Sequence, residues 1–519
     1  MTTRTEIAPQ DAIWLDLERP TALMVTDALL WFDDAVDFDA VQQVVASKFA
    51  NRFPGLRRRA VSEYGDHGPY YWEDDPGFDL ANHVVRTELP ADSGERGLQD
   101  YLSRTRSQPL PTDRPLWQVH FIERPPQGGA VLFRVHHSIA DGIRVSQIVM
   151  SLCDDARGRP LIPAPSPEAS NLVTGMRRSF TSSLQRGVGE IPAFAAGVAE
   201  QVSAGAESLA GRLTDAATRP GDTVEAALGH ARTSALGAAA AVREAWTDAA
   251  DLRLLSPSRV TDYFAAVRDN AETLRGLLFS TEDVVLTGPV GIDKQVAWSQ
   301  PVAMREIRKV AVRTGTTVPD VVIASLAGAV RRYTTERGRS LGTARWLMPV
   351  PVRPFGEALP HELGSLFALI PFDMPVDLDE PIPRLAEIHG RLADLRSGPA
   401  TMLAFGLAYL VPYVRGGAAR RVMERGAERS VGLLSNLPGP RRAAYLAGTR
   451  VVGVMGFAPT AGDQPLSVSI VSYDGGLRVG FAVDASTVDD PRALAAYTTE
   501  EFARLAEDVS VLDGTGPTP

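Results

Sequence analysis

The chain has 519 residues, of which 44% are hydrophobic and 22% are charged. This balance is typical of a globular protein that buries a core and excludes a wholly disordered chain. Lys and Arg number 53 against 63 Asp and Glu, so the formal net charge is −10, which argues against a general partner for nucleic acid. The single cysteine excludes a disulfide framework and any metal site built from several thiolates.

The N-terminus carries no sign of a secretory signal, because residues 1–11 read MTTRTEIAPQD and lack an apolar core. The longest nearly uncharged apolar stretch runs from Thr401 to Val414, which is shorter than the roughly 18–20 residues needed to cross a bilayer. We therefore expect a cytoplasmic protein, either free or associated with a membrane surface. Within that stretch we favour a buried helix over 402–414, with tunnel lining and membrane contact as alternatives.

Three regions differ in composition. Residues 1–157 and 281–519 mix strand-like and helix-like patterns, which predicts two domains of mixed class. The region 158–280 differs, because it contains 20 alanines over residues 191–250. Such a sequence forms helices readily but packs a weak core of its own. We interpret it as a helical linker or insertion between the two domains, with a role on a lipid surface as the alternative.

In the first region, apolar spacing predicts one helix, two strands and a second helix, in that order. The first helix spans Asp39 to Asn51. Residues Trp117 to Glu123 alternate like a half-buried strand, and Ala130 to Val135 form the second strand candidate. The second helix is expected to begin after Ser138, a residue type that caps helix N-termini.

In the last region, the same patterns predict two helices, three strands and a closing helix. The chain ends in a loose tail at residues 514–519. The predicted helices are 304–314, 321–333 and 490–507, and the predicted strands are 346–350, 466–473 and 477–483.

The most informative segment is residues 135–142, which read VHHSIADG. Neighbouring residues of a strand point to opposite faces, so His136 and His137 do not readily share a metal ion. Asp141 lies across the following turn and can fix the loop or a histidine tautomer, and Gly142 permits a tight backbone. A histidine held in this way suits general-base catalysis on a hydroxyl. A buried histidine pair with a helix-capping aspartate is the alternative.

Two other candidate nucleophiles fit poorly. Residues 338–342 (GRSLG) match the Gly-x-Ser-x-Gly pattern, but a nucleophile elbow follows a strand and precedes a helix. Here a helix pattern comes before the match and a strand pattern after it, so we expect a polar turn. Cys153 lies on a helical pattern just past the histidines and is interpreted as a small buried hydrophobic residue.

The spacing His136-His137-x-x-x-Asp141-Gly142 resembles the HHxxxDG signature of CoA-dependent acyltransferases. Further motifs resemble the bacterial wax ester synthase/diacylglycerol acyltransferase family, from about Pro9 to Leu505 apart from the Ala-rich middle. These motifs are Pro115-Leu116-Trp117, Ser435 to Pro440 (SNLPGP), Gln464 to Ser467 (QPLS), Ser472 to Gly475 (SYDG) and Asp484.

The resemblance implies an α/β (α+β) fold of two chloramphenicol-acetyltransferase-like domains, each a mixed sheet flanked by helices, with a substrate tunnel between them. It also implies direct acyl transfer. His137 would take the proton of an acceptor hydroxyl, whose oxygen would attack the thioester of acyl-CoA and release CoA. His136 and Asp141 complete the catalytic motif. Acyl-CoA is then a co-substrate, and neither a metal nor another cofactor is required.

The resemblance further implies positioning roles. Asp141 would be structural and paired with Arg353, for which an ordinary surface arginine is the alternative. The amide of Asn436 would donate to the oxyanion or position a substrate, and a turn residue before the following LPGP is the alternative. Leu116 and Trp117 are expected to pack against the histidine strand rather than touch substrate.

Two positions depart from the family pattern. The family usually shows Asn-Asp at the start of a helix where this chain has Pro319-Asp320, and Gly-Asn where it has Gly364-Ser365. Proline is comfortable at the first helical position, so the helix is retained while any contact of the missing amide is lost. Both changes could alter the preference for the acceptor.

We therefore expect an acyltransferase that esterifies the hydroxyl of diacylglycerol or a fatty alcohol with a long-chain acyl group. The implied partners are acyl-CoA and a hydroxylated lipid or alcohol, at a membrane or lipid-droplet surface, and no nucleic acid. Three alternatives stay open. They are an acyltransferase that uses another acceptor or a carrier-protein thioester, a non-catalytic lipid-surface protein, and a partner-binding scaffold.

Overall fold

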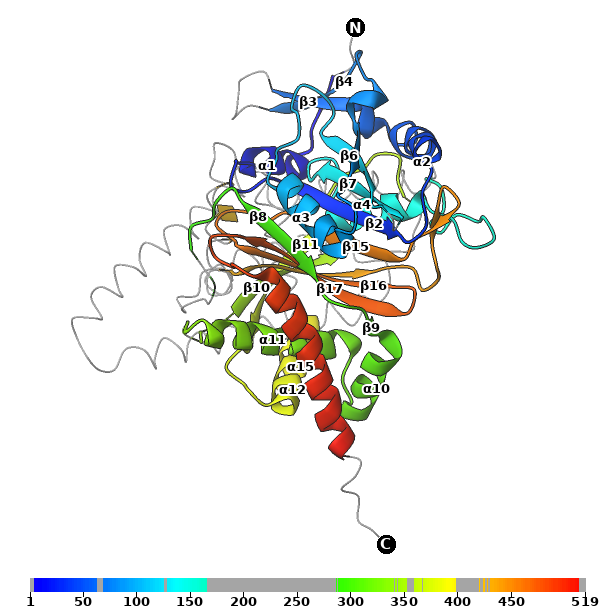
Figure 1. Ribbon diagram of the computed structural model, residues 1–519. Helices are drawn as coiled ribbons and strands as arrows, with labels where there is room; N and C mark the ends of the chain where they lie inside the picture. Colours follow the sequence, from blue (N-terminus) through cyan, green and yellow to red (C-terminus); the bar gives the residue numbers. More distant parts are fainter. Residues whose placement is uncertain are drawn as a thin grey trace, which may run out of the picture.

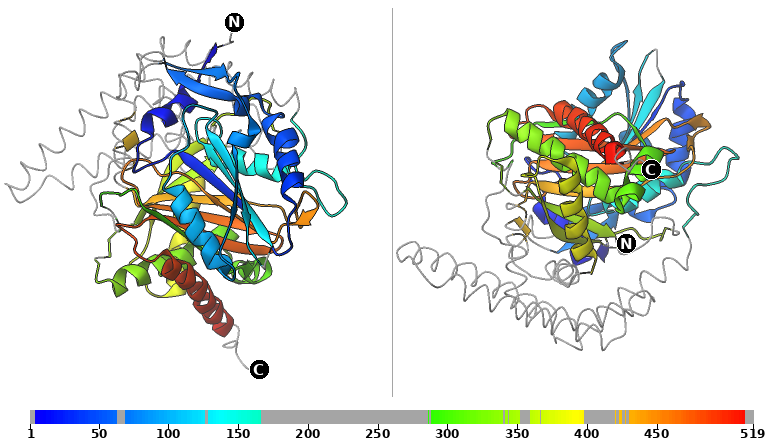
Figure 2. Two further views of the ribbon diagram at one scale, coloured as in Figure 1. Left: turned by 45° about the horizontal axis from the view of Figure 1, so that its top comes forward. Right: turned by 90° about the horizontal axis from the view of Figure 1, so that it is seen from below.

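A computed structural model describes residues 4–62, 69–125, 128–165, 286, 288–339, 341–342, 344–351, 359–365, 367–397, 420, 423–424, 427 and 430–512. It contains two mixed β-sheets that lie against each other, with helices on their outer faces (Figures 1 and 2). The predicted class, mixed sheets flanked by helices, is confirmed. The Ala-rich stretch 191–250, the apolar stretch 402–414 and the tail 514–519 lie outside the described residues.

The first sheet has five strands in the order β15–β2–β7–β6–β5. Only β5 and β6 run parallel, and the other pairs are antiparallel. The two strands predicted here are confirmed, and the second of them extends to His136. The bounds are β2 (Val25–Phe32), β5 (Val84–Glu88), β6 (Trp117–Glu123), β7 (Gly129–His136) and β15 (Gly453–Phe457).

The edge strand β15 comes from the last region of the chain. It pairs antiparallel with β2 from Gly453 opposite Trp31 to Phe457 opposite Asp27. Glycine is needed at 453, because a Cβ there would lie 2.0 Å from atoms of the Trp31 ring. The division of the chain into 1–157 and 281–519 therefore does not divide the sheets, since the first sheet takes a strand from each region.

The second sheet runs β11–β10–β12–β16–β17–β8, and the short β9 pairs with β17 beside β8. The pairs β10–β12 and β12–β16 are parallel. The three strands predicted for this region are confirmed as β10, β16 and β17. The bounds are β8 (Lys294–Trp298), β9 (Val302–Ala303), β10 (Ala344–Pro351), β11 (Phe367–Met374), β12 (Gly432–Pro438), β16 (Leu466–Tyr473) and β17 (Gly476–Asp484).

Among the described residues, four helices cover the outer face of the second sheet, at the bottom of Figure 1. The three predicted in this region are confirmed, and the second begins at Val318, three residues earlier than expected. Thr317 and Asp320 form a capping box around Pro319, which explains how the helix tolerates that proline. The helices are α10 (Met304–Thr314), α11 (Val318–Glu336), α12 (Pro381–Ser397) and α15 (Pro491–Leu512).

Across the described ranges, no single helix is long and apolar enough to span a membrane. Helices α10 and α11 are long and apolar enough when taken together, but they meet at an angle of 98°. Most of α11 is buried in the core of the second half.

The remaining elements belong to the first half, apart from one short hairpin. The predicted helix at 39–51 is confirmed, although its second part is a π-helix. The elements are α1 (Pro9–Leu17), α2 (Phe38–Val44), the π-helix η1 (Val45–Ala50), the 3₁₀ turns η2 (Pro54–Arg57) and η3 (Leu80–Asn82), α3 (Gly94–Arg106), α4 (Gly142–Ser151), the sheet β1 (Arg4–Glu6), β4 (Tyr70–Asp74) and β3 (Arg58–Ser62), and the hairpin β13 (Tyr445–Leu446) and β14 (Thr449–Arg450).

A buried aromatic cluster supports the histidine strand from its outer side. The Trp117 ring packs edge-on against Phe49, with ring centroids 5.0 Å apart, and its indole N–H donates to the Leu56 carbonyl at 2.7 Å. The Leu116 carbonyl accepts the N–H of His136 at 3.0 Å. Both residues therefore pack against the histidine strand, as expected. A separate cluster of buried hydrophobic residues, which includes Trp31 and Trp298, joins the two sheets.

Candidate active site

The two histidines lie where β7 ends and the chain turns into α4. The helix begins at Gly142, and its N-cap is Asp141, whose carboxylate accepts the N–H of Arg144 at 2.8 Å. The prediction that Ser138 caps this helix is wrong. A turn with a hydrogen bond from Ile139 N–H to the His136 carbonyl comes first, and the Ser138 hydroxyl lies 2.7 Å from Nδ1 of His136.

His136 is held away from the cavity described below. Its Nδ1 is hydrogen-bonded to the Ser138 hydroxyl, and its Nε2 lies 2.6 Å from a carboxylate oxygen of Glu18, just beyond α1. The ring is buried. The prediction that the two histidines face in opposite directions is confirmed, since His137 lines the cavity and His136 does not, and both ring nitrogens of His136 are bonded at the turn.

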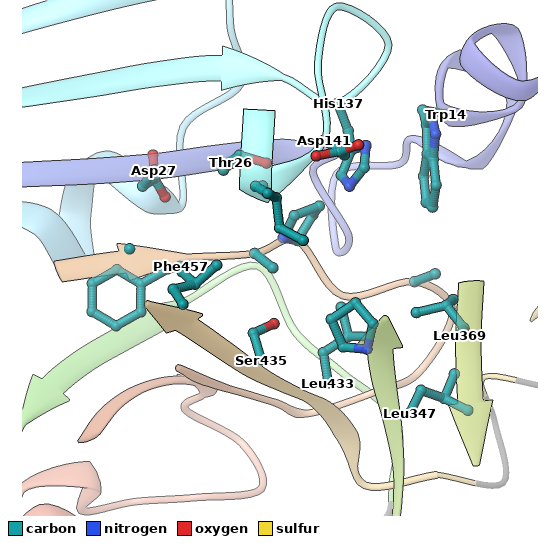
Figure 3. Close-up of a pocket in the computed structure, with 18 of the residues that line it drawn as sticks. Trp14, Thr26, Asp27, His137, Asp141, Leu347, Leu369, Leu433, Ser435 and Phe457 are labelled. Atoms are coloured by element: carbon teal, nitrogen blue, oxygen red, sulfur yellow. The ribbon is translucent and has the colours of Figure 1, made fainter. Parts of the chain in front are cut away.

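His137 faces the space between the two sheets (Figure 3). Its ring stacks on Trp14 of α1, with ring centroids 4.1 Å apart and planes 27° apart. The Ser365 hydroxyl lies 3.4 Å from His137 Nδ1 and donates to the His137 carbonyl at 3.3 Å. The backbone N–H of Ser365 donates to the carboxylate of Asp11 at 2.7 Å. Helix α1 thus supports the ring both directly and through Ser365.

Burial lowers the pKa of His137 from its ordinary value to about 3, and a hydrogen bond to its own backbone acts in the opposite direction. The imidazole is therefore neutral at physiological pH. Because the Ser365 hydroxyl proton goes to the His137 carbonyl, the oxygen of Ser365 is left to accept from an Nδ1–H. In that tautomer the lone pair of the ring lies on Nε2.

The cavity at His137 has a volume of about 880 Å³, including the part open to solvent. Its upper wall in Figure 3 comes from α1, β2 and the start of α4, and its lower wall comes from the second sheet and from the edge strand β15 of the first sheet. The lower wall is mainly apolar, with Leu347 and Pro349 of β10, Leu369 of β11, Leu433 of β12 and Phe457 of β15.

The structure brings three of the other predicted residues to this cavity. Asp141 and Gly142 line it at the start of α4. Asn436 also lines it, from an exposed position within β12, so the alternative of a turn residue is wrong. The backbone argument for Gly142 is also wrong, because a Cβ there would meet only Thr26 Cγ2, at 3.9 Å. Arg353 lies outside the described residues.

Sequence reasoning missed four residues that shape the site, namely Asp11, Trp14, Thr26 and Ser365. Ser365 was noted only as a departure from the family pattern. Thr26 lines the cavity and is 3% exposed, and its hydroxyl has no hydrogen-bond partner within the described part of the chain. The one signal for Thr26 in the sequence was that it is a polar residue within the largely apolar strand VTDALLWF.

Two further expectations agree with the structure. Burial raises the pKa of the Cys153 thiol to about 12, so the thiol stays protonated and behaves as a small hydrophobic group. The GRSLG match at 338–342 lies between the end of α11 and the start of β10, which is the reverse of a nucleophile elbow.

Within the described ranges, no group of three or more His, Cys, Asp or Glu side chains could hold a metal ion.

Comparisons with solved structures agree with this fold. A wax ester synthase/diacylglycerol acyltransferase from Marinobacter aquaeolei VT8 matches with a TM-score of 0.61 and 19% identity, over 98% of this chain and all of that one. The first condensation domain of the calcium-dependent antibiotic synthetase matches with a TM-score of 0.55 and 15% identity, over 98% and 96%. These likenesses confirm the predicted chloramphenicol-acetyltransferase-like fold.

Comparisons of sequence point to the chemistry. A Mycobacterium tuberculosis H37Rv protein named probable diacylglycerol O-acyltransferase tgs1 is 26% identical over 447 residues, which cover 85% of this chain and 82% of that protein. The model of the wax ester synthase/diacylglycerol acyltransferase catalytic domain matches residues 7–245, and the model of the C-terminal domain of the same family matches residues 363–506. The chain therefore belongs to the wax ester synthase/diacylglycerol acyltransferase family, and it is an acyltransferase.

Proposed function

We propose that this acyltransferase moves a long-chain acyl group from acyl-CoA to the hydroxyl of a lipid, either diacylglycerol or a fatty alcohol, with His137 as the general base. The observation that carries the proposal is the state of His137. It is a neutral, buried imidazole whose ring is held by Trp14 and Ser365 at the wall of a largely apolar cavity.

In the proposed reaction, Nε2 of His137 accepts the proton of the acceptor hydroxyl as its oxygen bonds to the thioester carbon. The carbonyl electron pair moves onto the carbonyl oxygen to give a tetrahedral oxyanion. When the carbon–oxygen double bond re-forms, the carbon–sulfur bond breaks and the proton on His137 passes to the departing thiolate. The products are an ester and free CoA, and no metal, cofactor or covalent enzyme intermediate takes part.

Two side chains are placed to donate to the oxyanion. The Asn436 amide and the Thr26 hydroxyl both line the cavity, from the second and the first sheet. The Thr26 hydroxyl is buried without a partner in the described part of the chain, and an unpaired buried donor gains most from an acceptor that the substrate brings. Asp141 acts differently, since it fixes the start of α4 and hence the turn that carries His137.

Both proposed substrates carry long hydrocarbon chains, which matches the apolar lower wall of the cavity. We place the reaction in the cytoplasm at the surface of a membrane or lipid droplet, where such substrates collect. An alternative acceptor, or an acyl group carried on a protein thioester, would use the same base and the same steps.

The test measures CoA release from palmitoyl-CoA by purified protein with hexadecanol, diacylglycerol, a short alcohol or no acceptor. His137→Ala is expected to lower acceptor-dependent release by roughly 10²–10⁴-fold. His389→Ala is the matched control, because His389 is bonded to Asp320 at 2.7 Å on the far side of the second sheet. Circular dichroism would confirm that both variants are folded.

The outcomes separate the alternatives. Release that depends on one lipid acceptor and is lost in His137→Ala supports the proposal and identifies the acceptor. Acyl transfer from an acyl carrier protein, but not from acyl-CoA, would show that the donor is a carrier-protein thioester. No transfer from any donor, with a folded protein that binds lipid vesicles, would contradict the proposal in favour of a non-catalytic lipid-surface protein.

A further inference from the structure

A second cavity lies between the start of β2 and the end of β17. It has a volume of about 400 Å³, including the part open to solvent, and among the described residues none lines both this cavity and the one at His137. Its walls carry three charged side chains, those of Arg106 at the end of α3, Lys294 at the start of β8 and Asp484 at the end of β17. Thr460 adds a hydroxyl group. The reaction steps proposed above use none of these four residues.

The carboxylate of Asp484 already accepts four hydrogen bonds. One oxygen accepts the N–H of Gly291 at 2.9 Å and the ammonium of Lys294 at 2.6 Å. The other oxygen accepts from the backbone N–H and the hydroxyl of Ser486. A carboxylate has about four lone-pair sites. Asp484 therefore balances the charge of Lys294 and has little capacity to accept a further donor.

Arg106 belongs to a buried group with one positive charge in excess. Its guanidinium bonds to the carboxylate of Asp27, and the Nε of Arg134 bonds to the other oxygen of the same carboxylate at 3.3 Å. The side chains of Arg106 and Arg134 are 12% and 1% exposed, and among the described residues no second carboxylate bonds to either. Two arginines thus share one counter-charge, and burying an unbalanced charge is costly unless a counter-ion joins it.

Two neighbouring groups respond to this positive charge. Burial lowers the pKa of His120 to about 3, and the charge of Arg134 acts in the same direction. Burial also lowers the pKa of Lys294, and the charge of Arg106 adds to this effect against the bond to Asp484, which raises the pKa. Both groups therefore lie in a positive potential, which favours an anion in the cavity.

The two cations that line the cavity keep N–H groups that bond to no described residue. The guanidinium of Arg106 has five N–H groups, and its side chain bonds only to the carboxylate already described and to the Ala458 carbonyl. The ammonium of Lys294 has three N–H groups and uses two, for a carboxylate and a carbonyl. The cavity therefore offers charged donors, a hydroxyl from Thr460 and an excess of positive charge.

We propose that this cavity binds a phosphate group, held by Arg106, Lys294 and Thr460. A phosphate carries several acceptor oxygens, and charge-assisted bonds from arginine and lysine are the strongest that it accepts in proteins. It would also supply the counter-charge that the two arginines lack. The phosphate belongs either to CoA, in which case this inference rests on the proposed function, or to a separate phosphate-bearing ligand.

Two variants test the site, each with a matched control. Thr460→Asp places a carboxylate where the phosphate would lie, and Thr460→Asn changes the shape in the same way without the charge. Lys294→Met removes one cation, and Lys309→Met does so on the exposed face of α10, where Lys309 bonds to Glu306 and lines neither cavity. Thr460→Asp keeps both cations and supplies their missing counter-charge, so it serves as the test if Lys294→Met does not fold.

The experiment titrates full-length protein by calorimetry with inorganic pyrophosphate and separately with CoA, at constant ionic strength, so that it does not depend on turnover. Circular dichroism checks the fold of each variant. We expect Thr460→Asp and Lys294→Met to weaken the binding of pyrophosphate by about tenfold or more, since each changes the charge that meets the phosphate. Thr460→Asn and Lys309→Met should bind it as wild-type protein does.

The CoA titration identifies the source of the phosphate. CoA that displaces pyrophosphate, and that binds more weakly to Thr460→Asp by the same factor, assigns the site to a phosphate of CoA. CoA that binds to Thr460→Asp as to wild-type protein, and leaves pyrophosphate bound, assigns it to a separate ligand.

The inference is overturned if wild-type protein does not bind pyrophosphate, if Thr460→Asp binds it equally well, or if the two control variants lose binding to the same extent. Wild-type protein that binds pyrophosphate as expected but transfers no acyl group would contradict the proposed function alone. Acyl transfer by a protein that does not bind pyrophosphate would contradict only the inference.

Discussion

The hydroxyl of Ser365 lies 3.4 Å from Nδ1 of His137, although 228 positions separate them in the chain. The same hydroxyl bonds to the His137 carbonyl, and the Ser365 backbone is anchored to Asp11. We therefore expect Ser365 to act as a positioning residue that favours the tautomer with the lone pair on Nε2. This is also one of the two positions at which the chain departs from the family pattern.

Ser365→Ala removes this hydroxyl, and we expect kcat to fall about fivefold with little change in KM. The reason is that one neutral hydrogen bond contributes about 1 kcal/mol to the orientation of the ring, while no substrate contact is lost. Steady-state kinetics with varied acyl-CoA measures both constants. Ser365→Thr keeps the hydroxyl and should restore most of kcat, and an alanine variant with wild-type kcat would show that Ser365 does not position the ring.

Trp14→Leu is expected to raise the pKa of His137 toward its ordinary value, because the stacked ring that shields the imidazole from water is removed. In wild-type protein the pKa of about 3 keeps the base neutral, so log kcat/KM has no inflection near pH 6.5. In the variant an acid limb should appear between pH 5 and 7. Trp14→Phe retains an aromatic ring and should keep the flat profile. A flat profile in Trp14→Leu would contradict the shielding role.

Burial lowers the pKa of His120 to about 3, as it does for His137. The unfolded chain therefore binds more protons than the folded chain between pH 6.5 and 3, so the free energy of unfolding falls as the pH is lowered through this window. Each histidine contributes a slope of about 1.4 kcal/mol per pH unit. Urea unfolding at pH 7, 6 and 5 measures the total slope.

His120→Gln should reduce that slope by about the contribution of one proton. Tyr101→Phe provides the comparison, because it removes the hydroxyl that bonds to His120 Nδ1 at 2.8 Å while the titrating ring stays in place. If the slope is the same in His120→Gln and in wild-type protein, the histidine does not titrate with the depressed pKa.

Glu501→Gln is expected to lower the free energy of unfolding by about 3–5 kcal/mol, because it leaves the Arg384 guanidinium buried without its counter-charge. These two side chains bond at 2.5 Å, and the Arg384 side chain is 1% exposed. They pack so closely on α11 that a Cβ at Gly328 would lie 2.2 Å from the Glu501 carboxylate. Thermal unfolding of Glu501→Gln beside Glu306→Gln, whose ion pairs are exposed, measures the effect. Equal unfolding temperatures in the two variants would contradict it.

The helices and strands that could be predicted from the sequence are those whose apolar residues recur with a clear period, or whose ends carry residues typical of helix or strand ends. The alternation of 117–123 and the apolar run of 466–473 gave β6 and β16 with their observed bounds. Strands β2 and β15 were missed, because VTDALLWF is buried throughout its length and does not alternate apolar with polar residues, and GVMGF is short and interrupted by glycine. Neither segment shows the period that marks a strand on a solvent-facing sheet.

The site shows the same limit. The local motif at 136–142 indicated His137 as the candidate base, which stays a prediction, and its alternative of a helix-capping aspartate is what the structure shows for Asp141. The contacts of His137 with Trp14 and Ser365 join segments more than 100 positions away on either side, and no local pattern encodes them. Ser138 was predicted to cap α4 because serine is a common cap, but its hydroxyl lies against His136 instead.

Because β15 is made late in synthesis, the first sheet lacks its edge strand until most of the chain has been made. Until Gly453–Phe457 leave the ribosome, β2 is the edge of the first sheet, and its outer backbone groups have no strand to bond. An open edge of buried, apolar residues invites pairing with other chains. The sheet that carries His137 is therefore incomplete until residues 453–457 have been made. We expect a chain that stops before residue 453 to expose this edge and to aggregate more readily than the full chain.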